Sequence, residues 1–160
     1  MAIRCAAKAI IVNNGRILLN RCCRQSGKVY YDLPGGGQHP FESMEQAVLR
    51  EVKEETGYTV RILRFAAVAE EIHTNPELQK KHPDYAHRMM HIFLAEIDGE
   101  DRDAPTEKDW GMEECVWIPV EEVKGLPEVR PTPVKERLDE ILNSGAPVYL
   151  GTEFVHWDHE

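Results

Sequence analysis

The chain has 160 residues, 42% of them hydrophobic, and a formal net charge of -9. This length and apolar content suit one globular domain over residues 1–160. The acidic balance argues against broad binding to duplex nucleic acid, and no apolar run is long enough for a membrane-spanning helix. The first residues turn polar too early for a secretory signal, so we expect a cytoplasmic protein that does not enter a membrane.

The first forty residues predict short β-strands. Runs of β-prone residues at 3–11 and 17–19 flank an Asn-Asn-Gly turn, which is typical of a hairpin. After a polar loop, the aromatic run 29–33 predicts another strand, and the Pro-Gly-Gly-Gly segment at 34–37 ends it.

The clearest predicted helix lies between Ser43 and Gly57. Ser43 stands where an N-cap belongs, Gln46 completes a capping box three residues later, and Gly57 is a typical C-terminal stop. One arc of this helix holds three apolar side chains that can pack on a sheet, Val48, Leu49 and Val52.

Two longer strands are predicted at 59–72 and 89–97. The polar stretch between them, 73–88, is expected to be a mobile surface loop. The rest of the chain predicts a short strand at 116–119, the start of a helix after Pro119, a helix at 132–143 and an edge strand at 148–157.

Cysteines and histidines do not form a convincing transition-metal pattern. The four cysteines lack both a C-x-x-C pair and paired zinc spacings, so we interpret them as reduced, packed thiols. His82, His87 and His91 lie close in sequence, but their spacing spans a loop and a strand, which favours solvent-facing side chains.

Acidic side chains gather on one face of the predicted helix. With Glu51 at 0° on a helical wheel, Glu55 lies at about 40° and Glu54 at about -60°, so the three carboxylates share about 100° of the surface. Like charges at these spacings destabilise a helix unless a cation compensates them. Because magnesium prefers carboxylate and phosphate oxygens, the pattern predicts a divalent-metal site.

The segment from Gly36 to Tyr58 resembles the signature of the Nudix family, G-x5-E-x7-R-E-U-x-E-E-x-G-U, in which U is a bulky aliphatic residue. Every fixed letter is present, and Tyr58 departs only at the last aliphatic place. A preceding strand pair, an aromatic-x-Leu-Pro lead-in at 31–34 and a later tryptophan-bearing strand also match. The resemblance implies an α/β fold, an α/β/α sandwich around a mixed β-sheet.

The resemblance also implies residue roles. Glu51, Glu54 and Glu55 match the catalytic metal ligands, joined by the backbone carbonyl of Gly35, and Arg50 matches the catalytic-site arginine that orients the glutamates. The expected ion is Mg²⁺, with Mn²⁺ as a substitute. Support for the signature loop is expected from Gly36, Gly37, Glu42 and Gly57.

The implied reaction is hydrolysis of a phosphoanhydride bond in a nucleoside-diphosphate-linked small molecule, by attack of water on phosphorus. Glu113 and Glu114 are candidates for a further metal ligand or base, with plain surface residues as the alternative. Candidate substrate contacts outside the signature, each also interpretable as a solvated or core residue, are Arg24, Lys28, Tyr31 and Arg88.

Several substrates and roles stay open. A nucleoside triphosphate or related nucleotide is the first interpretation, and an ADP-ribose or nucleotide-sugar pyrophosphatase is its alternative. Against that alternative, only 35 residues precede Gly36, and Thr74 stands where some such enzymes have a proline. A non-catalytic Nudix-fold module that senses a nucleotide is disfavoured because the signature glutamates are all present. A homodimer is neither indicated nor excluded.

Overall fold

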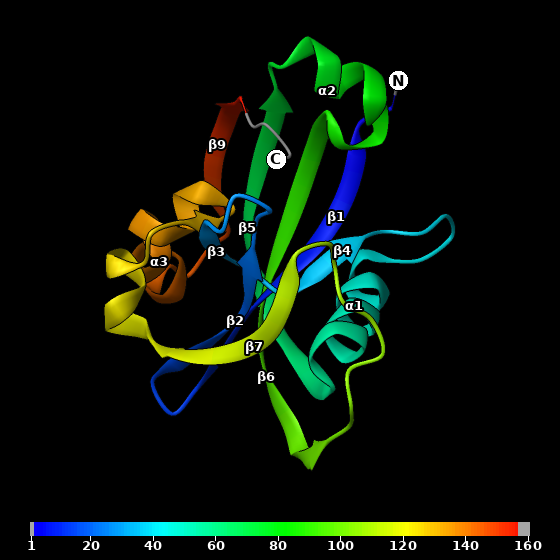
Figure 1. Ribbon diagram of the computed structural model, residues 1–160. Helices are drawn as coiled ribbons and strands as arrows, with labels where there is room; N and C mark the ends of the chain where they lie inside the picture. The colour runs from blue at the N-terminus through cyan, green and yellow to red at the C-terminus, as the bar shows by residue number, and fades with distance from the viewer. Residues whose placement is uncertain (1, 157–160) are drawn as a thin grey trace.

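The computed structural model describes residues 2–156, which form one mixed β-sheet and the helices that cover it (Figure 1). The described strands are β1 (Arg4–Asn13), β2 (Arg16–Cys23), β3 (Val29–Asp32), β4 (Gly35–Gly37), β5 (Tyr58–His73), β6 (His87–Arg102), β7 (Met112–Pro119), β8 (Val129–Arg130) and β9 (Val148–Val155). The helices in that range are α1 (Met44–Thr56), α2 (Pro76–Lys81) and α3 (Thr132–Asn143), with the 3-10 helices η1 (Pro83–Tyr85) and η2 (Val120–Gly125).

Strand β1 lies at the centre of the sheet, whose order is β8-β3-β2-β1-β6-β5-β9. Along one edge, β1 pairs in antiparallel fashion with β4 through its first half and with β2 through its last residues. Along the other edge it runs parallel to β6, with Arg4 opposite Arg88. Strand β7 pairs with β2, away from the main path. Parallel and antiparallel pairs are both present, so the sheet is mixed, as predicted.

Helices α1 and α3 lie on opposite sides of the sheet (Figure 1). Val48 and Val52 of α1 are fully buried with residues of β1 and β6, while Val134 and Ile141 of α3 join a separate core cluster on the other face. Each such side chain stabilises the fold by about 1.5–3 kcal/mol. The predicted α/β sandwich is therefore confirmed. Within residues 2–156, no helix is long and apolar enough to cross a bilayer.

The caps predicted for α1 are confirmed. The Ser43 hydroxyl accepts a hydrogen bond from the Gln46 N–H at 3.1 Å, and the Gln46 side-chain oxygen accepts one from the Ser43 N–H at 2.8 Å. Gly57 ends the helix with a φ of 76°, and a β-carbon there would lie 1.8 Å from the carbonyl oxygen of Asp103. Glycine is therefore required at this end of α1.

The prediction that Leu49 packs on the sheet is wrong, because its side chain is 38% exposed. The buried face of α1 also includes Glu51 and Glu55. The helix therefore turns part of its acidic side toward the sheet and turns Leu49 toward solvent.

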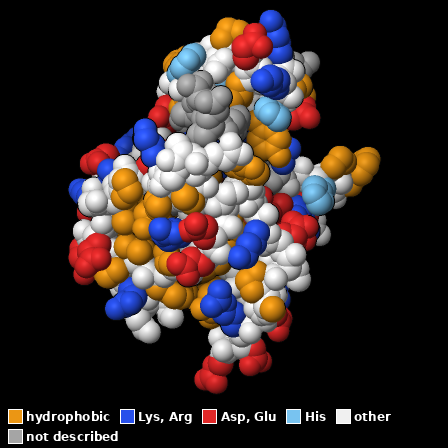
Figure 2. Space-filling model, in the orientation of Figure 1, with side chains coloured by type: hydrophobic (Ala, Val, Ile, Leu, Met, Phe, Trp, Pro, Cys, Tyr) orange, Lys and Arg blue, Asp and Glu red, His pale blue; other side chains and the backbone are white. Residues whose placement is uncertain are grey.

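The segment 73–88 is not the mobile loop that its polarity predicted. It forms α2 and η1, with Asn75 capping α2 by accepting a hydrogen bond from the Glu77 N–H at 3.0 Å. Leu78 is buried beneath it. A six-residue helix is too short to show helical periodicity in a polar sequence, which explains the wrong prediction. Figure 2 shows this region as a lobe with basic, acidic and histidine side chains on its surface.

Two short strands were not predicted. Residues 35–37, expected only to end a strand, form β4 on the edge of β1, and β8 has just two residues beside β3. The predicted helix at 132–143 is confirmed as α3. The predicted edge strand is confirmed as β9, and Trp157, the last residue of that prediction, lies outside the described residues.

A buried ionic cluster joins the ends of β5 and β6. Glu71 and His73 are almost fully buried, with the His73 Nε2 atom 3.4 Å from the Glu71 Oε1 atom. The same oxygen of Glu71 also forms an ion pair with Arg88. Burial alone would raise the pKa of Glu71, but His73 and Arg88 together lower it to about 2. The carboxylate is therefore held in its charged form.

Replacing Glu71→Gln should lower the free energy of unfolding by about 3 kcal/mol at about pH 7, because Arg88 loses its buried counter-charge. The pKa of Glu71 is lowered from 4.5, so its stabilisation is present above that pH and is lost as the pH falls toward about 2. Urea unfolding at about pH 7 and about pH 3 measures both effects. The exposed pair of Arg61 and Glu96 offers a control, Glu96→Gln. A wild-type advantage of equal size at both pH values would contradict the prediction.

Candidate active site

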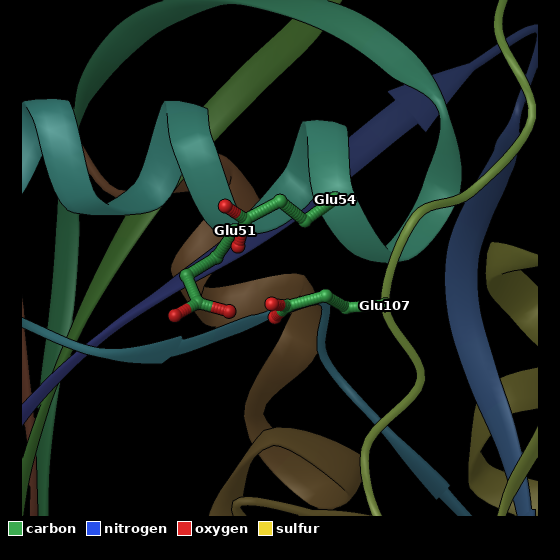
Figure 3. A group of neighbouring side chains, drawn as sticks. All are labelled: Glu51, Glu54 and Glu107. Atoms are coloured by element: carbon green, nitrogen blue, oxygen red, sulfur yellow. The ribbon is translucent and has the colours of Figure 1, made fainter.

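Three carboxylates from two segments meet beside β4 (Figure 3). One oxygen from each of Glu51, Glu54 and Glu107 lies within 4.8 Å of the others. Glu51 and Glu54 project from α1, and Glu107 reaches them from the segment between β6 and β7. Such a set of oxygens is what a hard divalent cation prefers, so the group is a candidate metal site.

The segment that carries Glu107 is anchored to the C-terminal end of α1. The backbone N–H groups of Thr106 and Glu107 donate to the carbonyl of Glu54, at 2.8 and 3.0 Å, and the Asp103 N–H donates to the Gly57 carbonyl at 3.0 Å. The last carbonyls of a helix lack partners within the helix and are available to such a segment. The end of α1 therefore supplies one carboxylate and holds the segment that supplies another.

Arg50 holds these carboxylates in position. Its Nε and Nη2 atoms donate to the two oxygens of Glu42, at 2.7 and 3.1 Å, and this bidentate pair lowers the pKa of Glu42 to about 2. Its Nη1 atom donates to Glu51 at 2.8 Å and to Glu54 at 3.0 Å, and Nη2 also donates to the Gly37 carbonyl at 3.0 Å. This arrangement agrees with the orienting role that the resemblance implies for Arg50.

Glycines of β4 allow the close approach of backbone and carboxylate. A β-carbon at Gly36 would lie 2.6 Å from the Glu51 carboxylate. Gly35 has a φ of 132°, and a β-carbon there would lie 2.2 Å from the carbonyl oxygen of Ala7 in β1. Any larger residue at either position would displace the strand or the carboxylate.

Glu55 lies behind the carboxylate group and is only 1% exposed. Its Oε2 atom accepts hydrogen bonds from the Asn20 side chain and from the Gly35 N–H, both at 2.9 Å. Burial, together with the charge of Asp109, raises the pKa of Glu55 to about 8 against the opposing effect of Lys8. The Oε1 atom is buried without a hydrogen-bond partner in the described residues.

These carboxylates fit a divalent cation. Burial raises the pKa of Glu51, while its pair with Arg50 opposes the rise and Glu54 adds to it. Crowded, partly buried acids of this kind keep their charge when a cation neutralises them. Glu51, Glu54 and Glu107 would hold the ion, and the unpartnered oxygen of Glu55 lies in the layer behind.

The candidate metal site opens onto a cavity of about 700 Å³, a size suited to a small-molecule ligand. Glu51, Glu107 and Asp109 lie on its wall, and Tyr30, Tyr85 and Trp110 also border it. The wall further carries four cationic side chains, Arg4, Lys8, Arg88 and Arg130. The wall thus carries both basic groups and carboxylates, which suits an anionic ligand that binds together with a cation.

Lys8 is a buried cation in an otherwise apolar part of β1. Its ammonium group lies 3.2 Å from the Asp32 carboxylate and donates to the Leu33 carbonyl at 3.1 Å. Burial acts to lower the pKa of Lys8, but Asp32 and Glu55 raise it above the ordinary value. Lys8 is therefore a fixed positive charge on the cavity wall.

Glu113 and Glu114, the predicted further ligands, are not brought to the carboxylate group. Both are exposed on β7, where Glu113 forms an ion pair with Arg21 of β2. The additional acidic residue comes instead from the preceding segment, as Glu107. The structure thus offers no support for a ligand role of either residue.

Of the four substrate contacts predicted outside the signature, only Arg88 lines the cavity. Arg24 pairs with Glu128 at 2.9 Å, Lys28 is exposed in the turn between β2 and β3, and Tyr31 packs against a core cluster. These three side chains pair with another residue, lie in solvent or pack in the core, so the geometry does not support them as substrate contacts.

The three histidines near α2 do not form a common site in residues 2–156. His87 lies 2.7 Å from Glu70, the His91 ring lies 6.2 Å from the ring of Phe65, and His82 borders the cavity.

Sequence reasoning missed Glu107, Lys8 and Arg4. Lys8 carried a usable signal, because a lysine inside an apolar strand must find a counter-charge. Glu107 and Arg4 carried none, because acidic residues in a polar segment and an arginine at a strand end are ordinary surface features.

Comparisons with known proteins bear on this geometry. The NUDIX domain model matches residues 3–141. The NAD-capped RNA hydrolase NudC of Chromobacterium violaceum is 31% identical over 121 residues, which cover 76% of this chain and 40% of that protein. A putative 8-oxo-dGTP diphosphatase of Bacillus subtilis is 32% identical over 93 residues, which cover 58% of this chain and 53% of that protein. The chain thus spans about half or less of these relatives.

The fold is similar to that of the MutT protein from Bacillus halodurans, with a TM-score of 0.71 and 23% identity over 99% of this chain and 94% of that chain. The names of the two relatives are those of hydrolases, in agreement with the enzyme class predicted from the sequence. Because the family model matches most of the chain, the protein belongs to the NUDIX family, as the segment from Gly36 to Tyr58 predicted.

Proposed function

We propose that this protein is a magnesium-dependent pyrophosphohydrolase that cleaves a phosphoanhydride bond in a nucleoside-diphosphate-linked small molecule, with a nucleoside triphosphate as the first candidate. The observation that carries the proposal is the convergence of Glu51, Glu54 and Glu107 at the wall of a cavity that also carries cations. Hydrolysis of a phosphoanhydride requires stabilisation of negative charge on several oxygens. Carboxylates that hold a cation and fixed basic side chains supply that environment together.

The metal-binding group is organised before a ligand arrives. Arg50 fixes the side chains of Glu51 and Glu54, and the backbone of Glu107 is held by the end of α1. Because these groups are already fixed, cation binding costs little conformational entropy, which favours affinity for the cation. Bound there, a divalent cation would polarise a phosphoryl oxygen and favour formation of hydroxide from water.

The basic side chains of the cavity favour a triphosphate over a dinucleotide. A free triphosphate carries more negative charge than a diphosphate between two sugars. The wall that would meet it carries Arg4, which has no carboxylate partner in residues 2–156, beside the paired cations Lys8 and Arg88. One relative is named for 8-oxo-dGTP and another for NAD-capped RNA, so relatives of this chain carry names for both kinds of nucleotide. An ADP-ribose or nucleotide-sugar pyrophosphatase is the second candidate, because the cavity is large enough for either.

Turnover of a nucleotide panel tests the proposed function. The panel holds nucleoside triphosphates, 8-oxo-dGTP, ADP-ribose, nucleotide sugars and dinucleoside polyphosphates, each with Mg²⁺ or with a chelator, and the products are identified by chromatography. At least one nucleotide should be cleaved at its phosphoanhydride, with a loss of about 100-fold or more in chelator. Absence of turnover across the panel, or turnover indifferent to the chelator, would refute the proposal and favour a nucleotide-sensing module.

Glu107→Gln should weaken apparent Mg²⁺ affinity by about 10- to 100-fold, because one of three converging carboxylates loses its charge. Glu113→Gln makes the same chemical change on β7, outside the group, and should stay within about threefold of the wild type. Activity measured against Mg²⁺ concentration separates the two variants. Equal effects of both substitutions would show that Glu107 has no special role.

A further inference from the structure

Arg4 has a setting unlike that of the other basic side chains on the cavity wall. Lys8, Arg88 and Arg130 each form an ion pair with a carboxylate, whereas residues 2–156 provide Arg4 with none. Its guanidinium carbon lies 4.6 Å from the centre of the Tyr85 ring, within the range of a cation–π contact. Within the described chain, the positive charge of Arg4 is therefore positioned without being neutralised.

The backbone of β4 leaves room for this guanidinium. A β-carbon at Gly37 would lie 2.4 Å from the Nη2 atom of Arg4, so the arginine occupies the space that a side chain would take. The neighbouring Gly36 stands in the same relation to the Glu51 carboxylate, at 2.6 Å. The β-carbon positions of consecutive strand residues point to opposite faces, so Glu51 and Arg4 approach β4 from its two sides. Both also line the same cavity.

Tyr85 is the last residue of η1, which follows α2 after one residue. The next strand, β6, then places Arg88 directly opposite Arg4 across the β1–β6 pair. Two arginines thus stand side by side at the end of the sheet, one neutralised by Glu71 and one held by an aromatic ring. The folded segment 73–88 therefore delivers the ring that fixes Arg4.

We propose that Arg4 binds a terminal phosphate of the substrate, next to the phosphates that the metal-binding carboxylates serve, and that Tyr85 positions it. A guanidinium fork binds phosphate oxygens through two parallel N–H donors, which an ammonium group cannot reproduce. The inference rests on the proposed function and adds a selectivity to it. The site selects substrates whose phosphate chain ends in an ionised phosphate over those in which a diphosphate joins two sugars.

Steady-state kinetics of the full chain, with four variants, test this selectivity. The variants are Arg4→Gln, Arg4→Lys, Tyr85→Leu and the exposed control Arg61→Gln, each checked for folding by circular dichroism and urea unfolding. Each nucleoside triphosphate is compared with the diphosphate sugar of the same base, for example ATP with ADP-ribose. Arg4→Gln should raise KM for the triphosphate by about 10- to 100-fold and change kcat less, with the sugar conjugate altered by less than about threefold.

The other variants sharpen the result. Arg4→Lys should recover part of the loss because it keeps the charge and lacks the fork, Tyr85→Leu should raise KM for the triphosphate alone, and Arg61→Gln should match the wild type. Equal losses for both substrates, or no loss for the triphosphate, would overturn the proposal. Wild-type preference for the sugar conjugate would overturn it too while leaving the hydrolase function intact.

A binding measurement separates this inference from the proposed function. Calorimetric titration with inorganic tripolyphosphate, in the presence of a chelator, needs no turnover. The wild type should bind it at least about 10-fold more tightly than Arg4→Gln. Equal affinity of the two proteins would refute the role of Arg4, whereas an inactive wild type that still shows the difference would refute only the hydrolysis.

Discussion

The guanidinium group of Arg50 is the interaction on which the rest of the site depends. Glu51 and Glu54 lie one turn apart on α1, and without a cation between them their charges would repel. Arg50 contacts both, and the same group fixes Glu42 and the Gly37 carbonyl. One planar cation with five donors thus joins a helix, a loop and a strand. The carboxylates remain converged because the arginine that balances them also holds their surroundings.

The C-terminal end of α1 extends this organisation to a distant part of the chain. Its unpaired carbonyls accept hydrogen bonds from the segment that follows β6, which brings Glu107 to the group. Gly57 permits this because any β-carbon there would collide with Asp103. A side chain at position 57 would therefore displace the segment that carries Glu107, even if α1 still ended there.

Local patterns predicted much of this protein, and non-local ones did not. The capping residues Ser43 and Gly57 and the spacing of Glu51, Glu54 and Glu55 are short-range features, so α1 and its acidic face could be read directly. Glu107 reaches the site through a loop whose path depends on backbone hydrogen bonds that no sequence pattern encodes. For the same reason the sequence predicts Glu113 and Glu114, both of which are exposed in the structure, where Glu113 pairs with Arg21. Leu49 is exposed, contrary to the prediction, because Glu51 and Glu55 occupy part of the buried side of α1.

A net charge of -9 and a polyanionic substrate are compatible because of where the charges lie. Most basic groups of the cavity are balanced by neighbouring carboxylates, as Lys8 is by Asp32 and Arg88 by Glu71, so they provide fixed dipoles more than free charge. Arg4, which is partly buried and has no carboxylate partner in residues 2–156, then has a larger effect on a charged ligand, because charge interactions are less screened away from bulk water. Selectivity among anionic substrates should therefore depend on which cation is left unpaired, more than on how many cations line the wall.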